Sequence, residues 1–405
     1  MRHLVLSVVL LAGTAAADVS PYEVQGYVDL RAVGVDTSLE SFLHGGLGLM
    51  RFDESHDGLQ FGRVAFDMSG PLTDSFRAQA TVIAADSDDD HAIDLTEGYI
   101  EWRPYPQSQW SWRTKLGAFY PPISLENRGV AWQSIYTLSP SAINTWIGEE
   151  VRTIGMEAKL TNAGAATQRP FDIGVVAAVY AWNDPMGVLL FQRGWAIHDY
   201  EIPVFGEIPR PFPRGANDHA VGFAQEIDNR PGYYAGIETR WYGRHVVRAL
   251  HYDNRADPAQ SNATNGAWLS RFDSLGARIE LPSNVTLIAQ WMGGDTAVGP
   301  SSDGRGMLIA DFWSWFGLAS YSHNGHRFTV RYDRMDVHST RGMRFFDSEQ
   351  NAHAWTAAYF YEHHDRWQIG IEGLRIDGSL QQRELKGLPA AAVEKQLQLA
   401  VRYSF

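Results

Sequence analysis

Apolar and polar residues alternate along most of this chain, and the alternation is most regular at its end. Between residues 396 and 405, polar or small residues alternate with apolar ones, which are Leu397, Leu399, Val401, Tyr403 and Phe405. Successive side chains of a β-strand point to opposite faces, so a period of two predicts a strand with one apolar face. This strand ends on an aromatic residue, and no segment follows that could cover its apolar face.

The same period of two recurs in segments of roughly ten residues, which is the length that a tilted membrane-spanning strand needs. These segments predict strands at residues 59–69, 76–84, 93–103, 110–118, 154–160, 171–181, 233–242, 245–253, 271–281, 285–292, 311–321, 327–337, 353–362 and 367–376. Residues 22–33 and 42–51 are weaker strand candidates.

Short turns and long connections alternate from Pro71 onward, as they do in membrane barrels with short turns on one side and longer loops on the other. If both termini lie on the inner side, an odd number of strands must precede the Pro71 turn. One of the two weaker candidates therefore does not span, or the two merge. This gives 16 strands, with 18 as the alternative. We predict an all-β fold, a transmembrane antiparallel β-barrel of about 16 strands.

The N-terminus has the pattern of a secretory signal peptide. Arg2 and His3 precede an apolar run at residues 4–11, and small residues at 15–17 form a cleavage site. We predict a signal peptide at residues 1–17 and a single barrel domain at residues 18–405, exported through the periplasm. No later stretch approaches the roughly 18 to 20 apolar residues of a spanning helix, which excludes a helical membrane protein.

Composition and charge exclude several classes of function. The net charge of −13 argues against a nucleic-acid partner, because phosphate binding needs a concentrated positive surface. The absence of Cys excludes disulfide scaffolds, thiolate metal sites and Cys nucleophiles. The 14 Trp and 38 Gly favour a barrel with aromatic girdles and a polar lumen over a soluble core, in which each indole N–H would need a partner.

The last strand, ending in Phe405, resembles the terminal strand of bacterial outer-membrane β-barrels, which closes the barrel and ends in Phe. This resemblance implies a location in the outer membrane of Gram-negative bacteria and contact with outer-membrane lipid and lipopolysaccharide. It also implies recognition of the last strand by the barrel-assembly machinery.

Residues 120–149 interrupt the alternation and, with 16 strands, form the third outer loop. Ile123, Trp146 and Ile147 make this loop too apolar to extend into solvent, and long loops are usually functional. It resembles the third loop of general porins, which folds into the barrel and narrows the pore. The resemblance implies a channel for passive diffusion of small hydrophilic solutes or ions, and a homotrimer. A compact outer lid with no role in conduction is the open alternative.

Residues 117–122, Gly-Ala-Phe-Tyr-Pro-Pro, are similar to a strand exit of phosphate-selective porins. Those porins line the pore with basic residues, whereas this chain has no surplus of Lys and Arg. The candidate residues of the pore constriction are Glu126, Arg128, Glu149, Glu150 and Arg152. Each of them could instead form a salt bridge that attaches the loop to the wall.

Charged residues occupy the polar face of the predicted strands, and the two signs nearly balance. A charged group in lumen water avoids the cost, about 2–4 kcal/mol for Arg or Lys, of facing lipid at midplane. The predicted pore-lining residues are Arg63, Asp67, Arg77, Glu97, Glu101, Arg113, Lys115, Arg240, Arg278, Arg331 and Arg402. The balance of signs also counts further acidic candidates on this face, which are Glu157, Glu238, Glu280, Asp333, Glu362 and Glu372.

Other chemistry has weaker support. His198 beside Asp199 could serve a barrel enzyme that hydrolyses lipid or peptide, but no Gly-x-Ser-x-Gly elbow is present. The acidic residues 86–90 lack a spaced calcium-ligand pattern, and the neighbouring side chains of His363 and His364 point to opposite faces. We therefore predict no catalytic residue, no metal and no cofactor. A second alternative is a secreted soluble β-rich protein that binds glycans.

Overall fold

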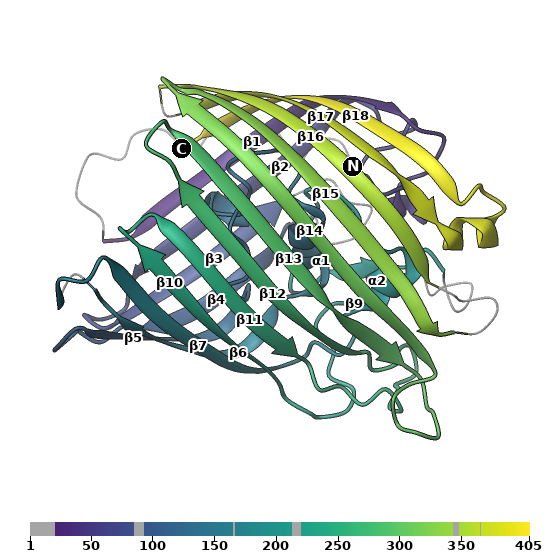
Figure 1. The fold of residues 1–405 in the computed structure, drawn as a ribbon, viewed down its shortest axis with the longest axis horizontal. Helices are drawn as coiled ribbons and strands as arrows, with labels where there is room; N and C mark the ends of the chain where they lie inside the picture. The colour runs from purple at the N-terminus through teal and green to yellow at the C-terminus, as the bar shows by residue number, and fades with distance from the viewer. Residues whose placement is uncertain (1–20, 85–92, 165–166, 213–219, 343–347, 365) are drawn as a thin grey trace.

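A closed barrel of 16 antiparallel strands makes up most of the structure, as the sequence predicts (Figure 1). The computed structural model describes residues 21–84, 93–164, 167–212, 220–342, 348–364 and 366–405. The barrel strands are β1 (Glu23–Asp36), β2 (Gly58–Pro71), β3 (Phe76–Ala84), β4 (Ile93–Trp102), β5 (Trp110–Phe119), β6 (Thr153–Asn162), β7 (Phe171–Ala181), β10 (Gly232–Trp241), β11 (His245–Asp253), β12 (Leu269–Glu280), β13 (Val285–Val298), β14 (Leu308–His323), β15 (His326–Arg341), β16 (Glu349–His363), β17 (Trp367–Leu380) and β18 (Ala391–Ser404).

The first and last strands close the barrel. β1 pairs with β18 in an antiparallel register that sets Leu30 opposite Val401. The backbone groups of Gly26 and Phe405 exchange two hydrogen bonds, at 3.1 and 3.0 Å, so the C-terminal aromatic residue takes part in the closure. No strand edge of the barrel is left unpaired among the described residues.

The two weaker strand candidates have different structures. All of the first candidate except residue 22 belongs to β1, which confirms it, whereas residues 42–51 do not form a strand. This second segment begins with a 3-10 helix, Phe42–His44, in which the Ser41 side chain accepts a hydrogen bond from the N–H of Leu43. Gly45 ends the helix with a φ of 83°, a backbone conformation that favours glycine.

The outer face of the barrel is apolar and exposed, and its inner face is polar and buried. On β18, Leu399 is 45% exposed, whereas its neighbour Gln398 is 1% exposed. On β15, Val330 is 50% exposed and the adjacent Arg331 is fully buried. This is the reverse of a soluble protein, and it is the distribution expected of a barrel whose outer face contacts lipid.

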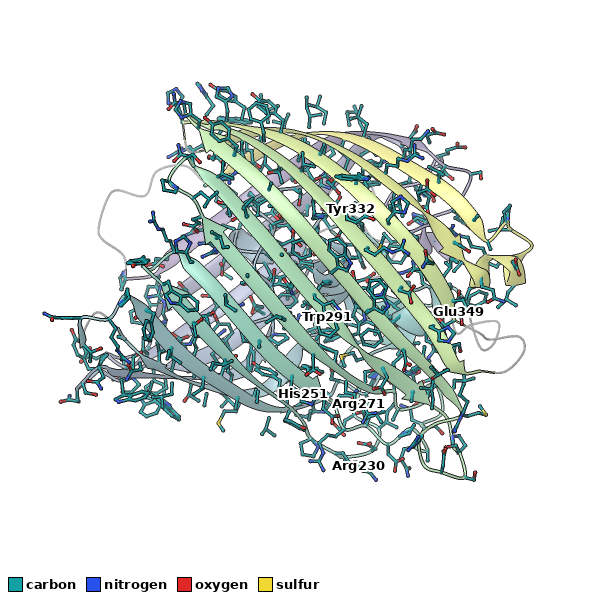
Figure 2. The ribbon with its side chains drawn as sticks, viewed as in Figure 1. Arg230, His251, Arg271, Trp291, Tyr332 and Glu349 are labelled. Atoms are coloured by element: carbon teal, nitrogen blue, oxygen red, sulfur yellow. The ribbon has the colours of Figure 1, made fainter. Side chains whose placement is uncertain are left out.

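The apolar belt covers only part of the strands from β11 to β16. Figure 2 shows Trp291 and Tyr332 partway along the wall, and His251, Arg271 and Glu349 nearer the ends that carry the long loops. On the outer face, Arg271 is exposed, and His251 and Glu349 are partly exposed. Lipid at midplane excludes such groups, so this part of the wall extends beyond the hydrocarbon layer.

The remaining elements lie in the long connections. They are α1 (Ala142–Glu150), α2 (Val188–Gln192), the short hairpin of β8 (Glu207–Pro209) and β9 (Ala220–Gly222), and two 3-10 helices, Val130–Trp132 and Gln381–Lys386. Within the described part of the chain, no helix is long and apolar enough to cross a bilayer.

The outward position of Leu399 can be tested by charge. We expect Leu399→Arg to lower the free energy of unfolding by about 2–4 kcal/mol, because the guanidinium would face lipid near midplane. Urea unfolding of the protein folded into phospholipid vesicles measures this change. Leu399→Ile is the control and should unfold close to wild type. An arginine variant as stable as this control would mean that Leu399 does not contact lipid.

Candidate functional site

Loop L3, which we define as residues 120–152 between β5 and β6, contacts inward-facing side chains of the opposite wall. The guanidinium of Arg331 on β15 donates hydrogen bonds to the carbonyl oxygens of Ser139, at 2.8 Å, and Pro140, at 3.0 Å. The carboxylate of Glu372 on β17 accepts hydrogen bonds from the N–H groups of Leu138, at 2.6 Å, and Ser139, at 3.1 Å. These bonds hold L3 against the inner face of β15 and β17, and Figure 1 shows α1 lying between the barrel walls.

Helix α1 forms part of a hydrophobic core inside the barrel. The Ser141 side chain caps its N-terminus by accepting a hydrogen bond from the N–H of Asn144, and all nine residues are buried. The Trp146 ring makes edge contacts with Phe272 and Phe312 of the wall, at centroid distances of 5.4 and 5.3 Å. The wall and L3 therefore pack together as a soluble protein core does.

Loop L4, residues 182–231 between β7 and β10, brings a carboxylate to three arginines. The Asp199 carboxylate lies 2.7 Å from Arg31 of β1, 3.2 Å from Arg51 and 3.9 Å from Arg63 of β2. All four side chains are nearly inaccessible to water. Burial alone would raise the pKa of Asp199, but the three arginines outweigh it and hold this pKa far below its ordinary value.

L4 also binds L3 directly. The Glu201 carboxylate accepts hydrogen bonds from Tyr120 Oη and Gln133 Nε2, each at 2.9 Å. Arg193 makes a bidentate ion pair with Glu149 of α1, at 2.6 and 2.8 Å. Because these polar groups are buried and paired, L3 and L4 form one packed unit inside the barrel.

Four of the five predicted constriction residues take part in this packing. Glu126 accepts hydrogen bonds from the N–H of Ser141 and from Asn144, and Glu149 pairs with Arg193. Glu150 accepts hydrogen bonds from Trp146 and from the N–H of Leu189, and Arg152 donates to the carbonyl of Ile202 and to Tyr120. The fifth, Arg128, is 43% exposed and lies 3.8 Å from Glu280 of β12.

The predicted lining residues all lie on barrel strands, on the inward side, but they differ in their access to water. Arg63 and Arg331 are covered by the loops, and Arg402 is close to Asp29, at 2.8 Å. Arg113 and Arg240 are 32% and 44% exposed. The intermediate or buried residues are Asp67, Arg77, Glu97, Glu101, Lys115 and Arg278.

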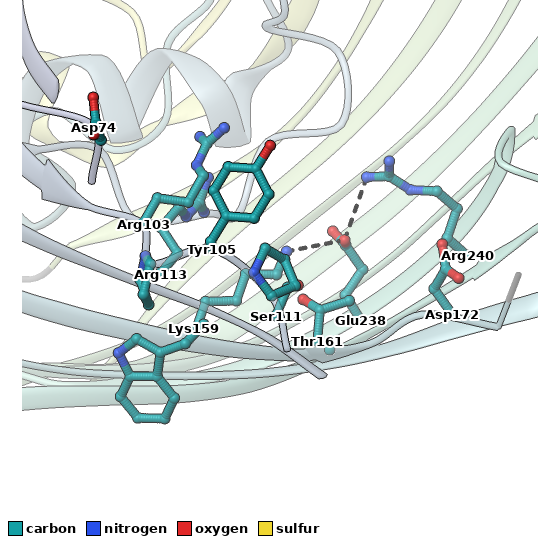
Figure 3. A pocket seen from close by; sticks show the side chains of 14 residues that line it. Asp74, Arg103, Tyr105, Ser111, Arg113, Lys159, Thr161, Asp172, Glu238 and Arg240 are labelled. Atoms are coloured by element: carbon teal, nitrogen blue, oxygen red, sulfur yellow. Dashed lines mark hydrogen bonds and ion pairs between the residues drawn. The ribbon is translucent and has the colours of Figure 1, made fainter. Parts of the chain in front are cut away.

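A cavity of about 470 Å³ opens at the end of the barrel that carries the short turns (Figure 3). The turn after β2, the turn after β4 and strands β5, β6, β7 and β10 form its wall. Four basic side chains line it, and they are Arg103, Arg113, Lys159 and Arg240. Its acidic residues are Asp74, Asp172 and Glu238.

Near Glu238 and Glu101, the basic side chains are more exposed than the acidic ones, whereas Asp74 in the turn after β2 is itself exposed. Glu238 is only 11% exposed and lies between Lys159, at 3.1 Å, and Arg240, at 3.4 Å, as the dashed lines of Figure 3 show. Glu101, on β4, is 7% exposed, whereas Arg103 beside it is 64% exposed. A solute in the cavity therefore meets more positive than negative charge near Glu238 and Glu101.

His198 has none of the exposure that a catalytic base needs. It is buried, its Nε2 lies 2.9 Å from Glu149, and its Nδ1 accepts a hydrogen bond from the N–H of Tyr200 at 3.2 Å. Burial lowers its pKa, and its ring stacks on Phe42. The neighbouring Asp199 is bound to arginines. The side-chain geometry therefore favours a packing role for this pair.

Two other predicted chemistries can be placed only in part. The rings of His363 and His364 meet edge to face with centroids 4.0 Å apart, so the expectation that they point to opposite faces is wrong. His364 follows the end of β16 with a φ of 51°, which breaks the alternation of the strand, and Asp365 lies outside the described residues. The acidic residues 86–90 also lie outside the described residues.

Comparisons with solved structures match nearly the whole chain. The outer-membrane channel DcaP of Acinetobacter baumannii is 12% identical, with a TM-score of 0.55, and the match covers 95% of this chain and 97% of that one. OmpF of Salmonella typhi, in complex with daunomycin, is 11% identical, with a TM-score of 0.52 over 95% and 97% of the two chains. An anion-selective porin from Comamonas acidovorans is 14% identical, with a TM-score of 0.51 over 95% and 99%.

This chain has the fold of the outer-membrane porins. No family model matches the sequence, and a comparison with curated proteins gave no match. The likeness to the solved porins therefore concerns the architecture of this porin-like barrel, and its chemistry has to be argued from its own residues.

The sequence analysis missed several residues of the porin-like interior. Arg31 and Asp29 share the inward parity of β1, so the period of two could have identified them. Asp199 and Arg193 lie in L4, where the sequence has no period, and nothing in the sequence indicates their partners.

The three arginines around Asp199 predict a large effect of removing its charge. We expect Asp199→Asn to lower the free energy of unfolding by about 3–5 kcal/mol, because it leaves buried guanidinium groups without their counter-charge. The temperature at which the folded band disappears in heat-modifiability gels reports the change. Asp303→Asn, which breaks an exposed pair with Arg341, is the matched control and should have little effect. Equal effects of the two substitutions would contradict this account.

Glu150 predicts a dependence of stability on pH. Burial raises its pKa from 4.5 to about 7, despite hydrogen bonds from Leu189 and Trp146. A carboxyl group with a raised pKa contributes stability below pH 4.5, and this contribution is lost as the pH rises through 7. We expect Glu150→Gln to remove this dependence and to stabilise the protein by about 3 kcal/mol at pH 8. Urea unfolding of wild type and Glu150→Gln at pH 4.5, 6 and 8 measures the free energy of unfolding of each protein. If the two free energies change in parallel with pH, the raised pKa of Glu150 is contradicted.

Proposed function

We propose that this porin-like barrel is an outer-membrane channel of Gram-negative bacteria through which small hydrophilic solutes and ions diffuse passively. The charged cavity of about 470 Å³ enclosed by the apolar wall is the observation that carries the proposal. Charged side chains inside a membrane protein are costly and usually mark a water-filled route for solutes. The exposed apolar belt and the porin fold support the location.

The proposed passage runs between L3 and the wall formed by β4–β7 and β10–β12. Arg248 of β11 donates a hydrogen bond to the carbonyl of Ser124 in L3, at 3.1 Å, and Arg128 of L3 faces Glu280 of β12. These contacts bring the tip of L3 close to the cavity side of the barrel. L3 would thus narrow the passage, with Arg128 as the predicted constriction residue that contacts solutes.

Anions are the ions that this passage should favour. Arg103, Arg128 and Arg240 are among the most exposed charged groups beside it, and the carboxylates of Glu101 and Glu238 are recessed. A narrow route with walls of low dielectric concentrates ions of the opposite charge. The overall charge of −13 does not oppose this, because selectivity depends on the charges beside the passage.

The structure offers no exposed catalytic constellation at His198, which favours a channel over a barrel hydrolase.

Two further parts of the proposed function stay predictions. The homotrimer and recognition by the barrel-assembly machinery rest on the resemblance of the sequence to outer-membrane barrels.

Planar-bilayer recording tests the channel. We expect wild type to give discrete conductance steps and a reversal potential of anion-selective sign in a KCl gradient. Arg240→Ala and Arg128→Ala should each shift this potential toward cation selectivity, because each removes an exposed positive charge from the passage.

Arg271→Ala is the matched control, since Arg271 pairs with Asp295 on the outer face of the barrel. It removes the same charge without altering the passage, and its reversal potential should equal that of wild type. If the folded protein gives no conductance steps, the proposal that it is a channel is wrong. If it gives conductance steps with a reversal potential of cation-selective sign, only the proposed anion preference is wrong.

A further inference from the structure

Three metal-ligating side chains meet in loop L1, which we define as residues 37–57 between β1 and β2. They are His44, Asp53 and His56, and the ligand atoms that they offer all lie within 4.8 Å of one another. This group is separate from the cavity and from the ion pairs of L3 and L4. His44 and His56 belong to two different turns of the loop, so the group joins segments that are well separated in the sequence.

Both turns are held in place by their own hydrogen bonds. His44 is the last residue of the 3-10 helix Phe42–His44, which Ser41 and Gly45 delimit. Asp53 accepts hydrogen bonds from the N–H groups of Ser41, at 2.8 Å, Ser55, at 2.9 Å, and His56, at 3.1 Å. The bond from Ser41 links the two turns, so little ordering of the backbone is needed when a ligand binds.

Loop L1 itself is attached to the barrel interior. The Leu49 carbonyl accepts a hydrogen bond from the N–H of Ile197 in L4, at 2.9 Å, and Arg51 pairs with Asp199. Phe42 is fully buried. The two histidines are therefore carried on a fixed base, as a pre-organised ligand site requires.

Asp53 orients the His56 ring. The Nδ1 of His56 lies 2.7 Å from the Asp53 carboxylate, which favours the tautomer with the proton on Nδ1. The lone pair of Nε2 is then available to a metal, and this carboxylate–histidine arrangement is typical of the surroundings of metal-binding histidines. Burial would raise the pKa of Asp53, but hydrogen bonds from Ser41 and His56 outweigh it and keep the pKa below its ordinary value.

The two imidazole rings lie side by side, within reach of one shared ion. Their centroids lie 3.7 Å apart, with an angle of 15° between the ring planes. A shared tetrahedral ion needs the lone pairs of its two ligand nitrogens to converge, so the ring of His44 would have to turn out of the parallel stack while Asp53 holds the ring of His56. The side chain of His56 is 42% exposed and that of Asp53 is 3% exposed, so an ion can approach the histidines from solvent.

We propose that His44 and His56 bind a transition-metal dication of the zinc class at the surface of L1, with Asp53 orienting His56 and water completing the coordination. Imidazole nitrogen favours zinc, copper and nickel ions over calcium and magnesium ions, which prefer oxygen ligands. The bound ion would connect the two turns of L1 across the loop end of the barrel.

Calorimetric titration of the full-length folded protein in detergent micelles with ZnCl₂ tests this site. Excess CaCl₂ is present throughout to occupy groups of carboxylates such as Asp184, Glu226 and Asp228. We expect His44→Ala and His56→Ala each to bind one equivalent of Zn²⁺ less than wild type. Asp53→Asn should bind the same number with about 10- to 100-fold lower affinity at this site, because the orienting carboxylate is lost.

His338→Ala is the matched control. His338 is an exposed histidine that pairs with Glu349 through Nδ1, and no third ligand lies with it in the described metal-ligand groups. Its removal should leave the stoichiometry at the wild-type value. Equal stoichiometry of wild type and both L1 variants would overturn the proposal.

A second measurement covers the case in which a variant folds poorly. Zn²⁺ should raise the temperature at which wild type loses its folded band, because the ion binds only the folded loop. EDTA should reverse the rise. The rise should be absent in His44→Gln, a polar substitution that keeps the hydrogen-bonding capacity of the position. An identical rise in wild type and His44→Gln would overturn the site.

Discussion

The structure depends on the cost of leaving a backbone polar group unpaired in lipid. Each unsatisfied N–H or C=O costs several kcal/mol in hydrocarbon, so a sheet can cross a membrane only when it has no open edge. Pairing of β1 with β18, which includes the two bonds between Gly26 and Phe405, removes the edge here. The closed wall encloses an interior, and the polar side chains that point into it must be hydrated or paired with other protein groups.

The inward-facing charges meet this requirement in two ways within one barrel. Along β1, β2 and β15, the loops L3 and L4 cover the charged groups and supply counter-charges, as Asp199 does for Arg31. Along β5, β6 and β10, groups such as Arg113 and Arg240 remain in contact with the cavity. The same parity of a strand thus produces a packed core on one side and an open, charged cavity on the other. Which of the two forms depends on where the loops lie.

The sequence predicts the wall well because lipid imposes a strict period of two on every spanning strand. It predicts strand ends less well. β13 continues to Val298, whereas the predicted strand ends at residue 292. The prediction stops early because the outer face above the apolar belt carries Asp295 in place of an apolar residue, so the alternation of apolar and polar residues is lost there. Residues 42–51 alternate weakly by chance, and local capping by Ser41 and Gly45 determines their structure instead.

The interior is less predictable than the wall. Arg331 and Arg240 have the same inward parity, yet L3 covers only the first, and sequence parity carries no information on this difference. Likewise, the partners of Asp199 depend on the position of L4 in space. The sequence does not predict the group of His44, Asp53 and His56. Its members are nine and three residues apart in an irregular loop, where no period relates them.

The buried ion pairs of L4 are better explained by specificity than by stability. Replacing a buried ion pair by apolar residues of similar volume is often neutral or stabilising, whereas removing one partner is costly. An apolar loop could pack against the polar inner wall in several positions, because hydrophobic contacts have no direction. Three guanidinium groups that converge on Asp199 allow one position of L4, since charge-assisted hydrogen bonds require both distance and angle. That position leaves only the short-turn ends of β5–β7 and β10 open to the cavity, and so the charges that hold the loops also determine where the cavity lies.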